Sequence, residues 1–214
     1  MFTLMSPCSV GIINYGAGNL RSVANALIEV GGNPVISSNP DELAKCDKLV
    51  LPGVGAFPHA MGILKERGID ELVRLSFKQN TPVLGICLGM QLLTHSSTEF
   101  EPTPGFCIVD AHVRALLDSS AQPDNFRTPH VGWTKIEQEV DDHWFFKGIC
   151  PSSRFYFVHS FGVTEASASI IAKARYNGVE FAAALETGSA IGTQFHPEKS
   201  GPEGLKLLRN FVRQ

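Results

Sequence analysis

The feature that most restricts the fold of this chain is a cysteine placed between a buried strand and a helix. Residues 82–86 form a short apolar run that predicts a buried strand, and residues 88–93 are typical of the opening of a helix, so Cys87 falls at the junction. Gly85 and Gly89 flank it, and glycine tolerates the backbone of a sharp turn. The G-x-C-x-G pattern matches the form of a nucleophile elbow, which predicts a reactive sulfur at the carboxyl edge of a sheet.

The predicted helix start gives this sulfur a favourable electrostatic environment. The partial positive charge of a helix N-terminus favours a thiolate, and the N–H of Leu88 is free to stabilise an oxyanion. The competing interpretation is a buried apolar cysteine, which is what most free cysteines are. The strand–turn–helix context favours the nucleophile.

A histidine and a glutamate near the C-terminus provide the groups that a nucleophilic cysteine needs. A predicted strand at 190–195 runs into His196, and Glu198 projects to the same side if the backbone stays extended. Pro197 between them fixes φ and blocks a helix. A carboxylate beside a histidine sets its tautomer and stabilises the imidazolium. Taken alone, the sequence His196-Pro197-Glu198 favours a surface turn. Together with Cys87 it predicts a catalytic triad.

Composition narrows the class of protein. The 214 residues predict one domain over residues 1–214, with a small insertion at most and with residues 1–9 as a fraying extension. A net charge of −3 excludes nucleic-acid or membrane-surface binding by bulk charge, and no apolar stretch is long enough for a membrane span. Five cysteines without a C-x-x-C pair argue against a disulfide scaffold. Together with the absence of a basic, apolar secretory start, they predict a reducing compartment, the cytoplasm.

Strand and helix patterns alternate through the first half of the chain. Strands are predicted at 10–14, 35–37, 48–51 and 82–86, and helices at 19–30, 41–45, 59–79 (broken around Gly68) and 204–212. This alternation predicts an α/β fold with a doubly wound, mostly parallel sheet flanked by helices. Short β-rich segments predict an added antiparallel region at 105–117, 132–137 and 154–163. In such folds ligands gather at the carboxyl ends of the strands.

Two glycine-containing loops follow predicted strands. In the loop 51–57 the N–H groups of Gly53, Val54 and Gly55 can supply a second oxyanion donor, with an ordinary strand-to-helix loop as the alternative. The G-x-G of segment 14–19 lacks the rest of a dinucleotide fingerprint. Ser22 stands near the third glycine position, and no acid ends the second strand.

The cysteine and histidine segments together resemble the class I (triad) glutamine amidotransferases. Five segments resemble, more narrowly, the glutaminase subunits of imidazole glycerol phosphate synthase, an enzyme of histidine biosynthesis. These segments are residues 14–22, 52–57, 129–133, 157–160 and 196–200. This resemblance extends over the chain from about residue 10 onward. The cysteine elbow alone identifies the superfamily, whereas segments 14–22 and 52–57 make the narrower assignment specific.

The resemblance implies a glutaminase reaction. Cys87 attacks the side-chain amide of glutamine, His196 moves the proton and Glu198 orients His196, and the resulting thioester is hydrolysed. The implied oxyanion hole comprises Gly53, Val54, Gly55 and Leu88, and the implied glutamine-binding residues are Gln91, Glu99, Ser160 and Phe161. For Glu99 a solvated loop acid remains the alternative, and Ser160 and Phe161 are expected to contribute backbone contacts.

The resemblance also implies a partner, a (β/α)8-barrel cyclase that receives ammonia through a channel and makes imidazole glycerol phosphate and aminoimidazole carboxamide ribotide. No cofactor is implied. The implied interface residues are Asn14, Asn19, Arg21, Trp133, Tyr156 and Lys199. For Trp133 and Tyr156 a core position is the usual interpretation. Two residues depart from the family pattern: Thr134 replaces the usual Asn, and Phe161 replaces a common Tyr.

His159 lies in an apolar strand pattern and is interpreted as a core histidine whose hydrogen bonds are satisfied, with a role near the active site as the alternative. No metal site is predicted, because ligand spacing is absent among His59, His95, His112, His130 and His143. Two other functions stay open, namely a stand-alone glutaminase or γ-glutamyl hydrolase, and a binding subunit without catalysis. The intact triad argues against the second.

Overall fold

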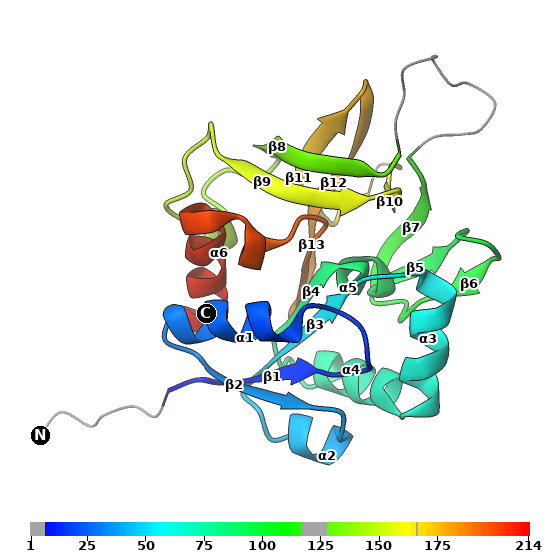
Figure 1. Cartoon of the computed structure of the whole chain (residues 1–214), viewed down its shortest axis with the longest axis vertical. Helices are drawn as coiled ribbons and strands as arrows, with labels where there is room; N and C mark the ends of the chain where they lie inside the picture. The colour runs from blue at the N-terminus through cyan, green and yellow to red at the C-terminus, as the bar shows by residue number, and fades with distance from the viewer. Residues whose placement is uncertain (1–6, 117–127, 166) are drawn as a thin grey trace, which may run out of the picture.

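A nine-stranded mixed sheet forms the centre of the structure (Figure 1), a computed structural model that describes residues 7–116, 128–165 and 167–214. The parallel part contains, in spatial order, β2 (Asn33–Ser37), β1 (Ser9–Ile13), β3 (Lys48–Gly53), β4 (Val83–Cys87) and β13 (Ala190–Thr193). An antiparallel part continues it through β12 (Val179–Thr187), β11 (Ile170–Tyr176), β8 (His130–Gln138) and β9 (Arg154–His159). The predicted doubly wound sheet is therefore confirmed.

Helices cover both faces of the parallel part. Figure 1 shows α1 (Leu20–Glu29) and α6 (Gly201–Arg213) together on one face and α3 (Phe57–Glu66) and α4 (Ile69–Lys78) on the other, while α2 (Pro40–Leu43) follows edge strand β2. Two apolar clusters result, one against α1 and α6 and one against α3 and α4. Successive strand residues alternate between the clusters, with Ile12 in the first and Ile13 in the second. Burial on both faces explains why these strands are continuous apolar runs.

Local signals in the sequence determine where the helices begin and end. Asn19 caps α1, because its Oδ1 accepts a hydrogen bond from Ser22 N at 3.2 Å. Gly68 lies between α3 and α4 with φ 66°, a left-handed conformation that suits glycine. The predicted break in the helical segment at Gly68 is therefore confirmed. None of the helices in the described parts of the chain has the length and apolar character needed to cross a membrane.

The predicted antiparallel region is divided between two sheets. Segments 132–137 and 154–159 lie in β8 and β9, which extend the main sheet. A second sheet contains β10 (Phe161–Val163), β7 (Val109–Ala115), β5 (Thr94–Ser97) and β6 (Thr103–Pro104). Its β5–β7 pair is parallel, and strand β5 was not predicted. The hairpin of β11 and β12 was not predicted.

The predicted N-terminal extension falls mainly on residues 1–6, which lie outside the described residues. Ser9 already belongs to β1, one residue before the predicted start of the strand. Its backbone N–H and its hydroxyl both donate to Asp47 Oδ2 at 2.7 Å. Ser9 therefore belongs to the sheet and not to the predicted extension.

Close packing around α5 (Leu88–Leu92) holds the junction after β4 in place. A β-carbon on Gly89 would lie 1.8 Å from the carbonyl oxygen of Leu51, and one on Gly85 would lie 2.6 Å from the carbonyl oxygen of Gly89. Both are glycine because backbone packs directly against backbone here. At this junction the residue with a positive φ is Cys87 itself, at 55°.

A Gly89→Ala variant tests this packing. The new methyl group cannot avoid a backbone carbonyl, so the free energy of unfolding should fall by roughly 3 kcal/mol or more. The matched control is Gly62→Ala in the exposed part of α3, where a β-carbon meets nothing within 4 Å. It should raise stability by roughly 0.5–1 kcal/mol. Urea unfolding followed by circular dichroism measures both, and equal effects would contradict the packing argument.

Candidate active site

Three side chains from two segments far apart in the sequence meet at the carboxyl edge of the parallel sheet. Cys87 ends β4, and His196 and Glu198 follow the adjacent strand β13, with Glu198 in the short helix η2 (Pro197–Lys199). His196 Nδ1 donates to Glu198 Oε1 at 2.8 Å, and these side chains are only 4% and 2% exposed. Cys87 is also buried, at 6% exposure. The structure thus brings together the three residues predicted to form the triad.

The backbone at Cys87 is strained. Its φ of 55° and ψ of −110° lie outside the regions that residues with a β-carbon normally adopt. The residue is also the N-cap of α5, so its sulfur lies at the positive end of a helix. Leu88 is the first helical residue, and its N–H has no partner within the helix. This geometry is that of the predicted elbow.

His196 is held in its protonated form. Burial alone would lower its pKa, but hydrogen bonding and charge attraction from Cys87 and Glu198 raise the pKa to about 9. Its Nε2 is buried, and within the described residues it has no hydrogen-bond partner of ordinary geometry. Nε2 is therefore free to exchange a proton with the sulfur and with a bound ligand.

A cavity of about 260 Å³ opens at the sulfur. The residues predicted for the oxyanion hole and for glutamine binding line most of it, and these are Val54, Gly55, Leu88, Gln91, Glu99, Ser160 and Phe161. Gly53 does not line the cavity; it pairs in register with Cys87 on the adjacent strand β3. A β-carbon on Gly53 would lie 2.7 Å from Gly89 N, so its role is close packing against the elbow.

Tyr15 is a buried neighbour of this loop that sequence analysis did not single out. Its hydroxyl lies 2.9 Å from where a β-carbon on Gly53 would be, and it has no hydrogen-bond partner among the described residues. Burial raises the pKa of Tyr15 above its usual range, the charge of Cys87 adds to this, and the Val54 backbone opposes it. The Tyr15 hydroxyl therefore lies beside the loop at 53–55 and close enough to Cys87 to feel its charge.

Hydrogen bonds already occupy several of the predicted ligand-binding groups. The Phe161 carbonyl accepts from Gln91 Nε2 and from His159 Nδ1, both at 2.8 Å, and the Ser160 carbonyl accepts from Leu116 N at 2.9 Å. Both lone pairs of the Phe161 carbonyl are therefore occupied, so a backbone contact from Phe161 to a ligand must come from its N–H group, whereas the Ser160 carbonyl keeps one lone pair. Glu99 Oε2 accepts from Phe57 N at 2.8 Å, so Glu99 caps α3 as well as lining the cavity.

Some of the predicted interface residues form an aromatic and cationic cluster beside the triad. The rings of Trp133 and Tyr156 are 6.0 Å apart, Lys199 Nζ lies 5.7 Å from the Tyr156 ring, and that ring is 6.4 Å from His196. Trp133 is 50% exposed, so the alternative of a core position is wrong for it. The cluster lies on the surface directly outside His196.

The other predicted interface residues lie around the start of α1. Asn19 and Arg21 are exposed, and Asn14 is partly buried, with its Oδ1 accepting from Gly16 N at 3.1 Å. Asn14 directly follows β1, so its position is at the same carboxyl edge of the sheet as Cys87 and His196. The predicted interface residues are scattered in the sequence, but the fold places them toward the edge of the sheet where the triad lies.

His159 is buried, as predicted for a core histidine, but it also lines the cavity at Cys87. Its Nε2 lies 3.1 Å from His130 Nδ1, and His130 Nε2 lies 2.8 Å from Thr134 Oγ1. Burial lowers the pKa of His130 to about 4 and that of His159 to about 3. Both rings are therefore neutral. Sequence analysis missed this pair, since nothing local indicates that strands β8 and β9 place these residues opposite each other.

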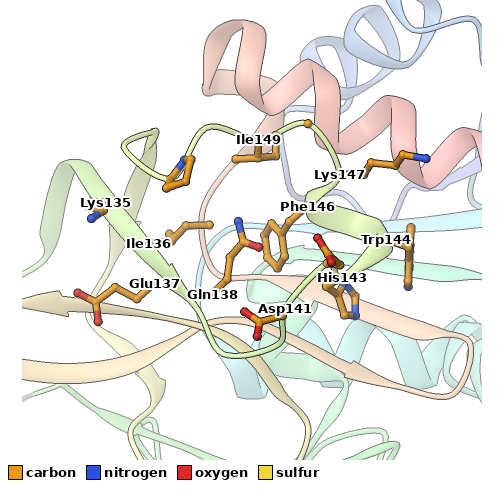
Figure 2. Close-up of a pocket in the computed structure, with 13 residues that line it drawn as sticks. Lys135, Ile136, Glu137, Gln138, Asp141, His143, Trp144, Phe146, Lys147 and Ile149 are labelled. Carbon is orange, nitrogen blue, oxygen red and sulfur yellow. The ribbon is translucent and has the colours of Figure 1, made fainter.

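Two further observations bear on ligands. No group of His, Cys, Asp or Glu side chains suited to a metal ion occurs among the described residues. A larger cavity of about 850 Å³ lies between β8 and the segment 141–151 (Figure 2). Its lining combines apolar side chains such as Phe146 with acidic side chains. Lys147 also lines this cavity but points away from the cavity's centre. None of the three triad residues lines it. The chemistry therefore belongs to the smaller cavity.

Comparison with known proteins agrees with this geometry. The family model described as glutamine amidotransferase class-I matches residues 11–214. The imidazole glycerol phosphate synthase subunit HisH of Methanosarcina barkeri is 44% identical over 205 residues, covering 94% of this chain and 96% of that protein. The subunit of the same name from Acinetobacter baylyi is 41% identical over 203 residues, covering 95% and 97%.

Solved structures agree on the fold. A crystal structure of a glutamine amidotransferase superposes with a TM-score of 0.72 at 19% identity, covering 95% of this chain and 97% of the other. PurLQS from Thermotoga maritima gives a TM-score of 0.72 at 18% identity, covering 98% and 99%. Taken with the sequence matches and the geometry at Cys87, these findings show that the chain belongs to the class-I glutamine amidotransferases and, within them, to the family of HisH subunits of imidazole glycerol phosphate synthase.

Proposed function

We propose that this chain hydrolyses glutamine to glutamate and ammonia at Cys87 and delivers the ammonia to a cyclase subunit of imidazole glycerol phosphate synthase. The observation that carries the proposal is the meeting of Cys87, His196 and Glu198 beside one small cavity. Its volume of about 260 Å³ is below the roughly 300–1,000 Å³ of pockets for drug-sized ligands and suits a single amino acid. The names of the relatives supply the metabolic context.

The first half of the reaction forms a thioester. Cys87 Sγ, whose proton has already passed to His196 Nε2 to give the protonated imidazole described above, attacks the side-chain carbonyl carbon of glutamine. The N–H groups of Leu88 and of the loop at 53–55 stabilise the oxyanion. His196 then gives its proton to the amide nitrogen, the C–N bond breaks, and ammonia leaves.

The second half releases glutamate. His196 takes a proton from water, the hydroxyl oxygen attacks the thioester carbonyl, and the C–S bond breaks. Sulfur leaves with the electron pair and regains its proton or remains the thiolate. Throughout, Glu198 keeps the Nδ1–H of His196 directed away from the sulfur, so that Nε2 carries out both proton transfers.

Polar groups on the cavity wall suit the α-carbon end of glutamine. Both hydrogens of Gln91 Nε2 are donated, one to the Phe161 carbonyl and one to Gln194 Oε1, which leaves Gln91 Oε1 as the atom available to a ligand. The Glu99 carboxylate lies on the same wall. Two acceptors of this kind favour the α-ammonium group.

A partner explains why the triad lies next to an exposed aromatic cluster. Ammonia that escapes into water at neutral pH is protonated and loses its nucleophilicity, so a direct transfer to the consuming site preserves it. The occupant proposed for the surface of Trp133, Tyr156, Lys199, Asn14, Asn19 and Arg21 is a (β/α)8-barrel cyclase. The cytoplasm is the proposed location, and its reducing conditions suit the free cysteines of the described residues.

Glutamate production measured under three conditions tests the proposed function: the chain alone, the chain with the cyclase subunit, and both with the cyclase's nucleotide ligand. Low turnover by the chain alone and strong turnover in the complete mixture would support a partner-dependent amidotransferase. Full activity by the chain alone, unchanged by the cyclase, would indicate the stand-alone glutaminase. The absence of turnover in every mixture would favour the binding subunit.

Replacing the nucleophile separates glutamine hydrolysis from partner binding. Cys87→Ala should lower glutamine-dependent turnover by at least about a thousandfold, because no other group forms the thioester. Binding to the cyclase and synthesis from added ammonium salt should stay at the level of the unmodified protein. Steady-state assays with glutamine and with ammonium measure both, and retained glutamine turnover would refute the role of Cys87.

The pH dependence tests the proton carried by His196. Because the leaving ammonia needs that proton, kcat/KM for glutamine should fall as the pH rises past about 9, where His196 becomes neutral. Glu198→Gln removes a charge that raises this pKa, so the alkaline limb should move to lower pH. The Glu198→Gln variant should lose less of its turnover rate than the Cys87→Ala variant. If the alkaline limb of the Glu198→Gln variant stays at the pH of the unmodified protein, a group other than His196 controls the fall in kcat/KM.

Trp133→Ala tests the partner surface. Removal of a half-exposed aromatic residue from an interface costs about 2 kcal/mol, which is a roughly thirtyfold weaker Kd for the cyclase. Val140→Ala is the matched control, since Val140 is 42% exposed and lies beyond the other end of β8. Isothermal titration calorimetry measures both variants, and equal binding by the two would place the interface elsewhere.

A further inference from the structure

A buried chain of polar side chains leads from strand β8 to the nucleophile. Thr134 Oγ1 bonds to His130 Nε2, His130 Nδ1 bonds to His159 Nε2, and His159 Nδ1 bonds to the Phe161 carbonyl at 2.8 Å. Gln91 Nε2 donates to the same carbonyl and to Gln194 Oε1 at 2.9 Å, and Gln194 Nε2 lies 3.7 Å from Cys87 Sγ. The contacts are continuous.

The Phe161 carbonyl determines the direction of every hydrogen bond in this chain, because a carbonyl oxygen can only accept. On one side, His159 must carry its proton on Nδ1. His159 is neutral, so its Nε2 accepts from His130 Nδ1–H. His130 is neutral as well, so its Nε2 accepts from the Thr134 hydroxyl. Both histidines therefore occupy the same tautomer, with Nδ1 protonated.

On the other side, the same carbonyl fixes the orientation of two amides. Gln91 must present its NH₂ group to Phe161, so its second N–H meets Gln194 and requires an oxygen there. Gln194 is completely buried, and its oxygen is therefore directed at Gln91 and its NH₂ group at the sulfur. A reversed Gln194 would set two NH₂ groups against each other and an oxygen against the sulfur.

The sulfur needs such a donor. The Val158 carbonyl lies 3.8 Å from Cys87 Sγ, and its oxygen favours the protonated thiol and disfavours a thiolate. An amide N–H on the same atom has the opposite preference. Negative charge collects on the sulfur when the thiol gives up its proton and again when the thioester is cleaved. Gln194 is placed to stabilise both states.

We propose that Gln194 is a further catalytic residue, whose amide N–H donates to the Cys87 sulfur and stabilises its thiolate form. Gln91, His159, His130 and Thr134 are positioning residues that fix the direction of this donation. The proposal deepens the proposed glutaminase function and rests on it for its catalytic meaning. The hydrogen bond itself is a property of the protein without any ligand.

Alkylation of Cys87 by iodoacetamide tests the donor without glutamine. Its rate against pH follows the thiolate fraction, and peptide mass spectrometry separates Cys87 from the exposed Cys107 and Cys150. Gln194→Met removes the donor at nearly constant side-chain volume. It should raise the midpoint of the curve of Cys87 alkylation rate against pH by about one pH unit. Gln194→Glu places a carboxylate at the sulfur and should raise this midpoint by more than Gln194→Met does.

Asn210→Asp is the matched control for the exchange of an amide for an acid. Its Nδ2 donates to the Phe145 carbonyl at 2.9 Å and it lies on α6, outside this chain of contacts, so the Cys87 midpoint should not move. If Gln194→Met and Gln194→Glu also leave the midpoint unchanged, the proposal is overturned, even if glutamine turnover falls. If the midpoint moves while the unmodified protein shows no glutaminase activity, the proposed function fails and the hydrogen bond stands.

Nitrogen-15 NMR of the unmodified full-length chain tests the direction of the bonds independently of any variant. His130 and His159 should both give the signals of neutral rings protonated on Nδ1, unchanged between pH 6 and pH 9. Protonation on Nε2 in either ring would reverse the chain and overturn the assignment. This measurement remains decisive if the Gln194 variants do not fold.

Discussion

The contact of Gly89 with the backbone of Leu51 is the constraint on which the rest of the site depends. It lets α5 lie directly on β3 and β4, with no side chain between the helix backbone and the sheet. The position of α5 in turn determines where Cys87, the Leu88 N–H and Gln91 lie. Strand β13 pairs with β4 in register, so His196 reaches the sulfur from the next strand. One backbone contact thus sets the geometry of nucleophile, oxyanion donor and base.

Local signals were enough to predict the parts of the fold that depend on local chemistry. The elbow, the His196–Glu198 pair and the break at Gly68 each follow from the conformational limits of a few adjacent residues. The elbow needs glycine at positions 85 and 89 because a β-carbon there would crowd the backbone, whereas the positive φ of Cys87 was not predicted. Close approach between segments distant in the sequence leaves no trace in the spacing of residues.

The residues that sequence analysis missed are those whose partners are distant along the chain. Gln194 lies in a predicted strand directly before His196, but its contacts are with residues 87 and 91. His130 has no local feature to separate it from a surface histidine, and its burial depends on the pairing of β8 with β9. The hairpin of β11 and β12 was overlooked in the same way. Buried polar residues acquire a role only when the sheet order is known.

Two histidines near the sulfur are similarly buried, but their pKa values are shifted in opposite directions. His196 interacts with Cys87 and with the Glu198 carboxylate, and its pKa rises to about 9; His159 bonds to a backbone carbonyl, and burial lowers its pKa to about 3. A charged partner compensates for the loss of water around a cation, whereas a neutral carbonyl does not. The site therefore contains one imidazolium and one pair of neutral rings. In the mechanism that we propose, the imidazolium transfers protons and the neutral pair orients the amides.

The positive φ of Cys87 has a consequence for how such a chain evolves. Every residue except glycine is strained at this position, so the nucleophile is retained at the expense of stability. In a lineage that no longer needs catalysis, replacement by glycine relieves the strain, and selection for stability alone favours it. The residue found at this position in a divergent relative therefore indicates whether that lineage still selects for chemistry or only for the fold.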